Sequence, residues 1–471
     1  MPAGTGTRYN CRPQHVARPS TFPIKEVELD SFMYRNGRLY CEEVAVNALA
    51  EQVGTPFYLY SANTLQRHYR ALAQAFAELQ PHICYSIKNC SNINIIGLLA
   101  QCGAGIDVVS GGELYRALQA GVAAEKIVFA GVAKSSEELR EALEAGVGWI
   151  NIESEEEFLN ARAIAAQLKR TARVALRINP NVHDTRTPDK CATGKKDSKF
   201  GVDISHARNF FRTYGRDEFL QLKGVHVHLG SPIYISEPYE TAIRVILSLV
   251  ADVEAAGWAS IEMVDLGGGF IAHYDSGQQG IHHWDQYAAS IVPLMQPFVQ
   301  RGGQVILEPG RSISANAGVL ISQVQYTKQG VDKKFVMLDT GMNHFIRPML
   351  YDAYHFIWPT VVAPGFEPAT RNPKQGMAGL QLYDVVGPIC ESSDYLARDR
   401  ELPPLQRGDL LCIYTAGAYC MAMASQYNSR PRPPEVLVDG HSATLIRRRE
   451  SYRDLIELEL APSPLILDHG R

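Results

Sequence analysis

The stretch KIVFAGVAKSSEELREALEAGVGWINIESEEEFLNARAIAAQLKRTARVALRI (126–178) decides the fold. Three short apolar runs lie in it, namely KIVFAGV (126–132), WINIE (149–153) and RVALRI (173–178). The two segments between them carry apolar residues at i, i+3 and i+4, which is typical of amphipathic helices. Ser135 and Ser154 stand where helix N-caps belong, and Glu157 follows Ser154 at capping-box spacing. The stretch therefore predicts three strands joined by two helices.

The same alternation continues on both sides of this stretch. The other runs that we interpret as strands are ICYSIK (83–88), GIDVV (105–109), GVHVHLG (224–230), EMVDLGG (262–268) and QVILEP (304–309). Another helix-like segment opens at Ser110, again a suitable N-cap. Eight strand–helix units over about 250 residues predict a (β/α)8 TIM barrel, which we place at residues 55–314. A doubly wound open sheet is the alternative, because periodicity does not show closure.

The remaining segments predict a second domain. The strand-like runs after the barrel are GVLISQVQYTKQ (318–329), KKFVMLD (333–339), GLQLYDVVGP (379–388), DLLCIYTAG (409–417) and EVLVDGHSATLIRRR (435–449). They have few helices between them, which predicts an antiparallel β domain over residues 315–471. Asn36-Gly37 is a strong hairpin turn, so residues 31–54 are expected to supply strands to that domain. Residues 1–30 are predicted to form a flexible tail.

Composition excludes several classes of function. The 471 residues are 46% hydrophobic and 20% charged, with a formal net charge of -4. Neither nucleic acid nor anionic lipid is therefore an expected partner, and no apolar stretch is long enough to span a membrane. The nine cysteines are odd in number and form no CxxC pair. Together with an N-terminus that lacks an apolar h-region, this favours a reducing cytoplasm over secretion.

Residues of unusual type fall at the predicted strand ends, where TIM-barrel active sites lie. They are Lys88, Arg177, His226, His228, Gly267, Gly268, Gly269, Glu308 and Arg311. Lys88 is either a solvent-exposed lysine or a desolvated amine of lowered pKa that can form a Schiff base. The three glycines make either a tight turn or a nest of backbone N–H groups for a phosphate. Glu308 and Arg311 either form an ion pair that holds their own loop together, or bind a ligand. In the second case Glu308 keeps a ring nitrogen protonated and Arg311 binds an anionic group.

Two further motifs allow alternative interpretations. His226 and His228 should point to one face of their strand, either as a metal pair or with one ring stacked on a flat cofactor. We find no acidic or histidine cluster at the other strand ends, which favours stacking over metal binding. Cys390 is either a core thiol or, beside Glu391 and Asp394, a titratable proton donor.

Taken together, the motifs resemble one enzyme family. The set is YSIKNCSN (85–92), GIDVVSGGEL (105–114), HVHLGS (226–231), DLGGGF (265–270), EPGR (308–311), GPICESSD (387–394), AGAY (416–419) and YNSRPRPPEVLVDG (427–440). It is similar to the fold type III (alanine-racemase-like) decarboxylases that use pyridoxal 5'-phosphate (PLP). Within that family it is most similar to the diaminopimelate decarboxylases. The matches run from about residue 55 to 440 in the family's order.

The resemblance implies a role for each matching residue. Lys88 would carry PLP as a Schiff base, and Cys390, from the partner subunit of a homodimer, would donate the proton. The residues implied to contact PLP are Lys88, Asp107, Arg177, His228, Ser231, Gly268, Gly269, Glu308, Gly310, Arg311 and Tyr419. Those implied to hold the substrate are Arg311, Arg347, Tyr351, Glu391 and Tyr419.

The implied reaction is decarboxylation of meso-2,6-diaminopimelate to L-lysine. Two departures from the family pattern bear on it: Asn89-Cys90 after the lysine, and TPDKCAT within the loop 183–201. The alternatives are a decarboxylase of D-ornithine, D-lysine or L-ornithine, or a non-catalytic PLP-binding homologue. A racemase is disfavoured, because Glu308 stands where racemases of this fold have an arginine.

Overall fold

The computed structural model describes residues 30–194, 198–274, 282–368, 371 and 376–462. They form two compact units. The first contains Ser61–Gly318 and Gly417–Ala422, and the second contains Phe32–Tyr60, Val319–Ala416 and the chain from Met423. The tail predicted for residues 1–30 lies almost wholly outside the described residues. Every helix in the described part is too short or too polar to cross a bilayer.

The first unit is a closed parallel barrel. Its eight strands are β5 (His82–Ser86), β6 (Gly105–Val108), β7 (Ile127–Phe129), β8 (Trp149–Ile152), β9 (Ala172–Asn179), β11 (Leu220–His226), β12 (Met263–Asp265) and β13 (Gln304–Leu307). The ring closes where β13 pairs with β5, in the register Ile306 to His82. The predicted TIM barrel is therefore confirmed, and the open-sheet alternative is wrong. The short strand β10 (Val202–Asp203) pairs with the end of β9 outside this ring.

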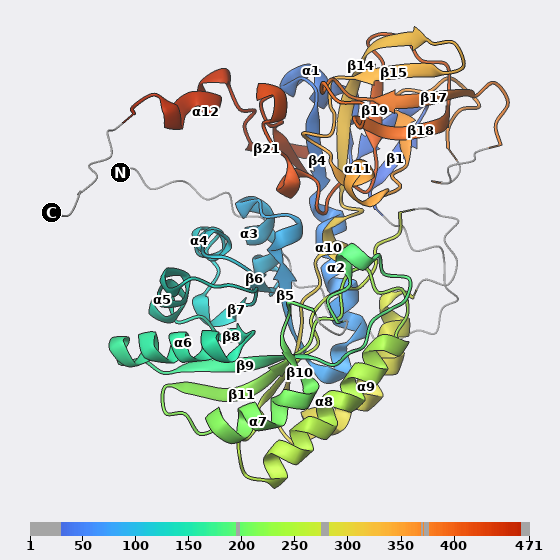
Figure 1. The fold of residues 1–471 in the computed structure, drawn as a ribbon. Coiled ribbons are helices and arrows are strands. Elements are labelled where there is room, and N and C mark those ends of the chain that lie inside the picture. Colours follow the sequence, from blue (N-terminus) through green and yellow to red (C-terminus); the bar gives the residue numbers. More distant parts are fainter. Residues whose placement is uncertain (1–29, 195–197, 275–281, 369–370, 372–375, 463–471) are drawn as a thin grey trace. The chain divides into compact units, whose positions relative to one another are not determined.

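Helices surround the barrel strands (Figure 1). They are α2 (Ala62–Ala75), α3 (Ile93–Gln101), α4 (Gly111–Gln119), α5 (Ser136–Ala145), α6 (Glu155–Leu168), α7 (Ile204–Tyr214), α8 (Glu237–Ala255), α9 (Trp284–Gln300) and the short α10 (Arg311–Ser314). Ser110, Ser135 and Ser154 cap α4, α5 and α6 through their side chains, as predicted.

The barrel interior is apolar in its lower layer. Six buried residues from six strands form one cluster, namely Cys84, Val128, Trp149, Ala175, Met263 and Ile306. Gly224 makes room for it, because a Cβ there would lie 2.8 Å from the Ala175 and Met263 side chains and 3.1 Å from Trp149. Asp265 follows Met263 in β12 and Glu308 follows Ile306 after β13, so both acids lie closer to the C-terminal ends of the strands than this packed layer.

The second unit is a separate sheet domain of mostly antiparallel strands. Its strands are β4 (Phe57–Ser61), β14 (Gly318–Gln329), β15 (Lys334–Leu338), β16 (Ile357–Pro359), β17 (Gln381–Val386), β18 (Tyr395–Leu402), β19 (Leu410–Ile413), β20 (Glu435–Asp439) and β21 (Ser442–Arg447). Its helices are α1 (Val46–Val53), α11 (Arg347–Tyr351) and α12 (Tyr452–Ile456). The pair β15 and β17 runs parallel.

The N-terminal strands belong to this second unit. β1 (Phe32–Arg35) and β2 (Arg38–Cys41) form a hairpin that continues into β3 (Val44–Ala45). Asn36 and Gly37 both have positive φ, of 51° and 73°. This is the primed turn that the sequence predicted, and it suits the right-handed twist of the two strands.

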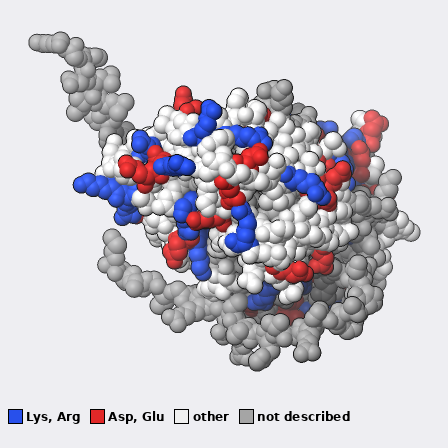
Figure 2. Space-filling view, turned by 90° about the horizontal axis from the view of Figure 1, so that it is seen from below, with Lys and Arg blue, Asp and Glu red and all other residues white. Residues whose placement is uncertain are grey.

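The surface carries charge of both signs. On the face in Figure 2, Lys and Arg are interspersed with Asp and Glu. Several of these charges are paired at the surface, for example Arg208 with Asp252 at 2.6 Å. The mixed surface agrees with the small net charge of the chain.

One predicted helix cap is only half formed. Ser154 accepts a hydrogen bond from the Glu157 N–H, but the Glu157 carboxylate does not return one to complete the capping box. Instead it pairs with Lys134 at 2.7 Å. Lys134 also donates to the backbone oxygens of Gly131 and Asn151, and its side chain is only 1% exposed. A buried cation with three acceptors thus joins α6 to the β7 loop and to β8.

We expect Lys134→Met to lower the free energy of unfolding by about 3 kcal/mol, because it leaves Glu157 buried without its cation. Urea unfolding of the purified variant measures this. Arg208→Ala is the matched control, because its ion pair is exposed and should contribute at most about 1 kcal/mol. Equal losses in the two variants would contradict the structural importance of Lys134.

Candidate active site

A cavity of about 300 Å³ opens at the C-terminal ends of the barrel strands. Its lining residues are Lys88, Val109, Ala130, Gly131, Val132, Arg177, Thr193, Phe200, His226, His228 and Glu308. Five of them, namely Lys88, Arg177, His226, His228 and Glu308, were singled out in the sequence. The barrel thus brings together residues that are more than 200 positions apart in the chain.

Lys88 lies in a short 3-10 turn directly after β5 and pairs with Asp107 of β6. The distance from Lys88 Nζ to Asp107 Oδ2 is 2.9 Å, and Asp107 is fully buried. Burial acts to lower the pKa of Lys88, but Asp107 and then Glu308 outweigh it, so the net pKa is raised. The predicted lowered pKa is therefore wrong for this arrangement, since two carboxylates favour the charged amine more than burial disfavours it.

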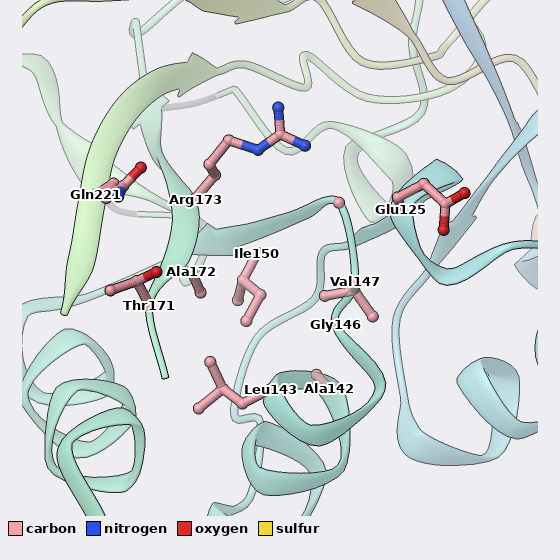
Figure 3. Close-up of a pocket in the computed structure, with 11 residues that line it drawn as sticks. Glu125, Ala142, Leu143, Gly146, Val147, Ile150, Thr171, Ala172, Arg173 and Gln221 are labelled. Carbon is pink, nitrogen blue, oxygen red and sulfur yellow. The ribbon is translucent and has the colours of Figure 1, made fainter. Parts of the chain in front are cut away.

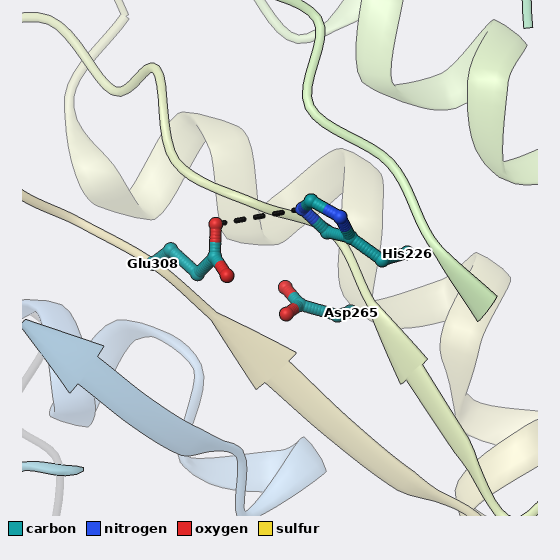
Figure 4. Close-up of side chains that lie close together, drawn as sticks. All are labelled: His226, Asp265 and Glu308. Carbon is teal, nitrogen blue, oxygen red and sulfur yellow. Dashed lines mark ion pairs between the residues drawn. The ribbon is translucent and has the colours of Figure 1, made fainter. Parts of the chain in front are cut away.

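Glu308 follows β13 and faces the barrel interior, 3% exposed. Its Oε2 lies 3.5 Å from His226 Nε2, while its Oε1 has no hydrogen-bond partner among the described residues (Figure 4). Burial acts to raise the pKa of Glu308, but His226 and Lys88 reverse this, and the net pKa is lowered. Glu308 therefore presents a negative charge to the cavity.

Asp265, at the end of β12, completes a compact group with His226 and Glu308. One donor atom from each of the three lies within 4.8 Å of the other two. The sequence predicted no acidic cluster beside the histidine pair, and that prediction is wrong. It failed because the three residues are neighbours only through the pairing of β11, β12 and β13. Such a group could enclose a cation or share a proton.

His228 lies two residues beyond the end of β11, not within the strand as predicted. The Gly268 N–H donates to its Nδ1 at 3.1 Å, so the proton of the neutral ring is on Nε2. Burial, together with Lys88 and Arg177, lowers the pKa of His228 well below its usual value. The ring is therefore neutral and flat, and it lines the cavity.

The glycines after β12 are sterically required. A Cβ on Gly268 would lie 2.1 Å from the Glu308 carbonyl oxygen, and one on Gly269 would lie 2.5 Å from that of Gly230. Gly269 also has a φ of +107°, which side chains rarely adopt. At Gly310, a Cβ would lie 2.6 Å from the Asn89 side chain. The backbone can approach an anion closely here only because these side chains are missing.

Arg311 lies next to this glycine segment. Its Nε donates to Ser231 Oγ at 3.1 Å and its Nη1 donates to Tyr274 Oη at 2.8 Å. Its Cζ lies 4.8 Å from the centre of the Tyr419 ring. Tyr419 belongs to the segment Gly417–Ala422, which clusters with the barrel. Arg311, Ser231, Tyr419 and the glycines thus form one cationic, donor-rich corner, suited to a phosphate group.

Arg177 is held by a residue that the sequence interpretation missed. Its Nη1 donates to Glu153 Oε1 at 2.6 Å, and Glu153 Oε2 accepts from the Gly201 N–H at 2.8 Å. Arg177 also lies over the ring of Phe200, with Cζ 4.6 Å from its centre. Glu153 thus joins β9 to the end of the loop 183–201. Its position directly after β8, at a C-terminal strand end, could have indicated this.

Asn89, one of the departures from the family pattern, is a second missed residue. Its side-chain amide donates to the Ser86 carbonyl, and its Oδ1 accepts from Ser314 Oγ. Its own carbonyl accepts from the Tyr419 N–H at 2.8 Å. Asn89 therefore links the turn that carries Lys88 to α10 and to the Tyr419 segment.

The other predicted substrate and proton-donor residues lie in the second unit. Arg347 and Tyr351 belong to α11, where the Arg347 Cζ lies 5.7 Å from the centre of the Tyr351 ring. Arg347 is 6% exposed, and its Nε contacts His355 Nε2 at 3.2 Å. Cys390 and Glu391 follow β17 and are exposed, and Glu391 accepts from Tyr427 Oη and from Ser393 Oγ. Cys390 is one of eight described cysteines, all of them free thiols.

A second cavity in the barrel unit, of about 320 Å³, lies at the opposite ends of the strands (Figure 3). Its lining combines small and apolar residues with Thr171 and Gln221, and its charged residues are Glu125 and Arg173. Arg173 lies over the Trp149 ring, 4.9 Å from its centre. Because this cavity is at the N-terminal ends of the strands, it matches the face that stabilises a TIM barrel and not the face that carries chemistry.

Comparison with known proteins identifies the family. The family "Pyridoxal-dependent decarboxylase, pyridoxal binding domain" matches residues 62–315, which include the whole barrel and its cavity. The chain belongs to the pyridoxal-dependent decarboxylases. Pyridoxal phosphate is therefore its cofactor, and the predicted family is confirmed.

Individual relatives are similar over nearly their full length. The chain is 41% identical to a diaminopimelate decarboxylase of Aquifex aeolicus over 91% of this chain and 97% of the relative. It is 40% identical to that of Haemophilus influenzae, over 92% and 99%. Among solved structures, the diaminopimelate decarboxylase of M. jannaschii in complex with L-lysine has a TM-score of 0.84 at 36% identity, covering 92% of this chain and 98% of that one.

The residues of the cavity fit PLP. A cofactor with a phosphate, a flat ring and an aldehyde needs an anion cradle, a flat neighbour and an amine. The glycine segment, with no room for any Cβ, and Arg311 meet the first need. His228 and Lys88 meet the other two, and the Glu308 side chain lines the same space.

Glu113, in the first turn of α4, makes the stability of this region depend on pH. Burial raises the pKa of Glu113 to about 7, although the Val109 N–H that it accepts acts in the opposite direction. At pH values between the pKa of Glu113 in the unfolded chain and its folded pKa of about 7, the folded protein keeps a proton that the unfolded chain releases. The free energy of unfolding therefore falls as pH rises through this range. Glu113→Gln should therefore be stabilised relative to the parent at pH 8 and not at pH 4, by about 2 kcal/mol.

Thermal unfolding of both proteins at the two pH values tests this. Glu138→Gln is a control of opposite sign, because the Gly111 N–H lowers the pKa of Glu138 and its contribution to stability is present above pH 4.5. That variant should be less stable than the parent at pH 8. A Glu113→Gln variant whose Tm difference from the parent is the same at both pH values would refute the prediction.

Proposed function

We propose that this protein decarboxylates meso-2,6-diaminopimelate to L-lysine and CO2, the last step of lysine biosynthesis. The observation that carries the proposal is the cavity in which Lys88, His228 and Glu308 meet beside the glycine and Arg311 corner. The relatives that match over nearly their whole length are named diaminopimelate decarboxylases, and one is solved with L-lysine. Both support this substrate over another diamino acid.

PLP, when bound, supplies an electron sink for the pair released by the departing carboxylate. Lys88 would provide the amine to which the cofactor attaches, and Asp107, at 2.9 Å, would hold that amine in place. Glu308, buried and negatively charged, would hold a proton on the ring nitrogen. His228 would pack against the ring as a neutral, flat surface.

The cofactor's phosphate would be bound by Ser231, Gly268, Gly269, Gly310 and Arg311, with Tyr419 alongside. Arg311 is already fixed by Ser231, Tyr274 and Tyr419, so binding needs little reordering of its side chain. Arg177, held by Glu153, would support the ring oxygen side of the cofactor. Together these residues would hold the cofactor in one orientation and so would position the substrate's Cα bonds relative to it.

The substrate residues divide by charge. Arg347 and Arg311 suit carboxylates, Glu391 suits the distal ammonium, and Tyr351 and Tyr419 offer hydroxyl groups. Cys390 would return a proton to Cα. We propose, from the resemblance to the family, that it acts in the active site of the partner subunit of a homodimer; its thiol is exposed on a loop of the second unit and so is accessible to a partner.

The substrate proposal predicts a clear order of rates. A CO2-release assay should find kcat/KM for meso-diaminopimelate ten- to a hundredfold above that for lysine or either ornithine, because a charged hydrogen bond to the second carboxylate contributes about 1.5–3 kcal/mol. Arg347→Met should remove most of this preference and leave the cofactor absorbance unchanged. Equal turnover of D-ornithine or D-lysine would overturn the assignment of substrate.

The shared-site proposal is tested by complementation. Lys88→Ala and Cys390→Ala should each be inactive alone, because one lacks the cofactor amine and the other the proton donor. Mixed and allowed to exchange subunits, they should regain activity, because a mixed dimer holds one intact site. Activity that stays at background after mass spectrometry demonstrates exchange would rule out a site shared between subunits.

A further inference from the structure

The group formed by His226, Asp265 and Glu308 has more negative charge than its surroundings can compensate. All three side chains are buried, at 1%, 0% and 3% exposure. They come from adjacent strands, with His226 and Asp265 directly paired in register. Figure 4 shows the two carboxylates pointing toward each other below the His226 ring.

The nearby cations are already engaged elsewhere. Lys88 pairs with Asp107 at 2.9 Å, and Arg177 pairs with Glu153 at 2.6 Å. His226 lies 3.5 Å from Glu308. Two carboxylates this close in an apolar interior cannot both be ionised, so one of them must hold a proton.

The contacts decide which carboxylate holds it. Glu308 Oε2 lies 3.5 Å from His226 Nε2, and the positive charge of Lys88 acts on Glu308. Asp265 has no ion pair among the described residues; its Oδ1 accepts from the Gly267 N–H at 2.8 Å, and its Oδ2 has no partner there. The unpartnered atoms, Asp265 Oδ2 and Glu308 Oε1, are the pair that a shared proton would join.

We propose that Asp265 is a positioning residue that works as a neutral carboxylic acid, donating a hydrogen bond to Glu308 so that Glu308 alone carries the negative charge of the group. This rests on the proposed role of Glu308 at the ring nitrogen. A protonated Asp265 holds the Glu308 carboxylate in place without competing for the cofactor's proton.

The other titratable groups that face Asp265 agree with this assignment. They are Cys84, Asp107, His226 and Glu308. Burial, followed by the charge of Glu308, raises the pKa of Asp265 well above its usual value. Burial also raises the pKa of the Cys84 thiol, so that neighbour stays neutral. Within the described part of the chain, none of these groups forms an ion pair with Asp265.

Infrared spectroscopy of the holoenzyme at neutral pH tests the proposal directly. A protonated carboxyl group has a C=O band separate from those of carboxylates and amides. In enzyme made with aspartate labelled with carbon-13 at its side-chain carboxyl, this band should shift. It should be lost in Asp265→Asn and persist in Asp252→Asn, a surface control. A spectrum with no label-sensitive band, or a band that survives in Asp265→Asn, overturns the proposal.

Activity gives a second measurement. Asparagine can replace a neutral acid as acceptor and donor, so Asp265→Asn should keep kcat within about threefold, whereas Asp265→Leu, which can do neither, should lose at least about tenfold. A folded Asp265→Asn enzyme with a tenfold loss would show that the negative charge is needed. If Asp265→Asn does not accumulate, Asp107→Asn replaces it in the infrared test, and loss of the band there overturns the proposal.

The two proposals fail separately. Absence of CO2 release from diaminopimelate would overturn the function and leave the infrared band intact. Absence of the band would overturn the role of Asp265 in an enzyme that still turns over its substrate.

Discussion

The pairing of β13 with β5 is the constraint on which the site depends. It places Glu308, which follows the last strand, beside the turn after the first strand, which carries Lys88. The same closure brings Gly310 against Asn89, at a distance that leaves no space for a side chain. An open sheet made of the same eight strands would leave these residues at opposite edges, and the cavity would not exist.

Closure also concentrates charge in a small volume. Above the apolar layer of Trp149 and Met263, the barrel holds Lys88, Asp107, Asp265 and Glu308 within a few strands of one another. Burying ionised groups is costly unless each has a partner. Lys88 pairs with Asp107, and Arg177 pairs with Glu153. A buried carboxyl group that has no cation beside it must be neutral. The number of acidic residues that the strands place at this end of the barrel therefore determines which carboxyl groups in the site are ionised.

The sequence predicted the parts of this structure that depend on local patterns. Apolar runs and serine caps located the eight strands and three of the helices, and Asn36-Gly37 located the hairpin, because periodicity and turn chemistry act over a few residues. What it missed depends on pairing between distant strands. Glu153, Asn89 and Asp265 lie at strand ends or inside motifs that the sequence showed, but the partners that define their roles lie in other segments. Glu157 lies in the first turn of α6 as predicted, but its carboxylate pairs with Lys134 and does not complete the capping box. Local sequence patterns do not indicate that contact.

The segment Gly417–Ala422 leaves the sheet domain and clusters with the barrel, where Tyr419 lies against Arg311 and bonds to Asn89. The barrel is thus not a module that can be excised with a single cut. A gene fragment ending at Gly318 would encode all eight strands and yet lack one wall of the anion corner. Recombination between relatives of this family would likewise have to exchange the last part of the chain together with the barrel, so the two units are expected to be inherited as one piece.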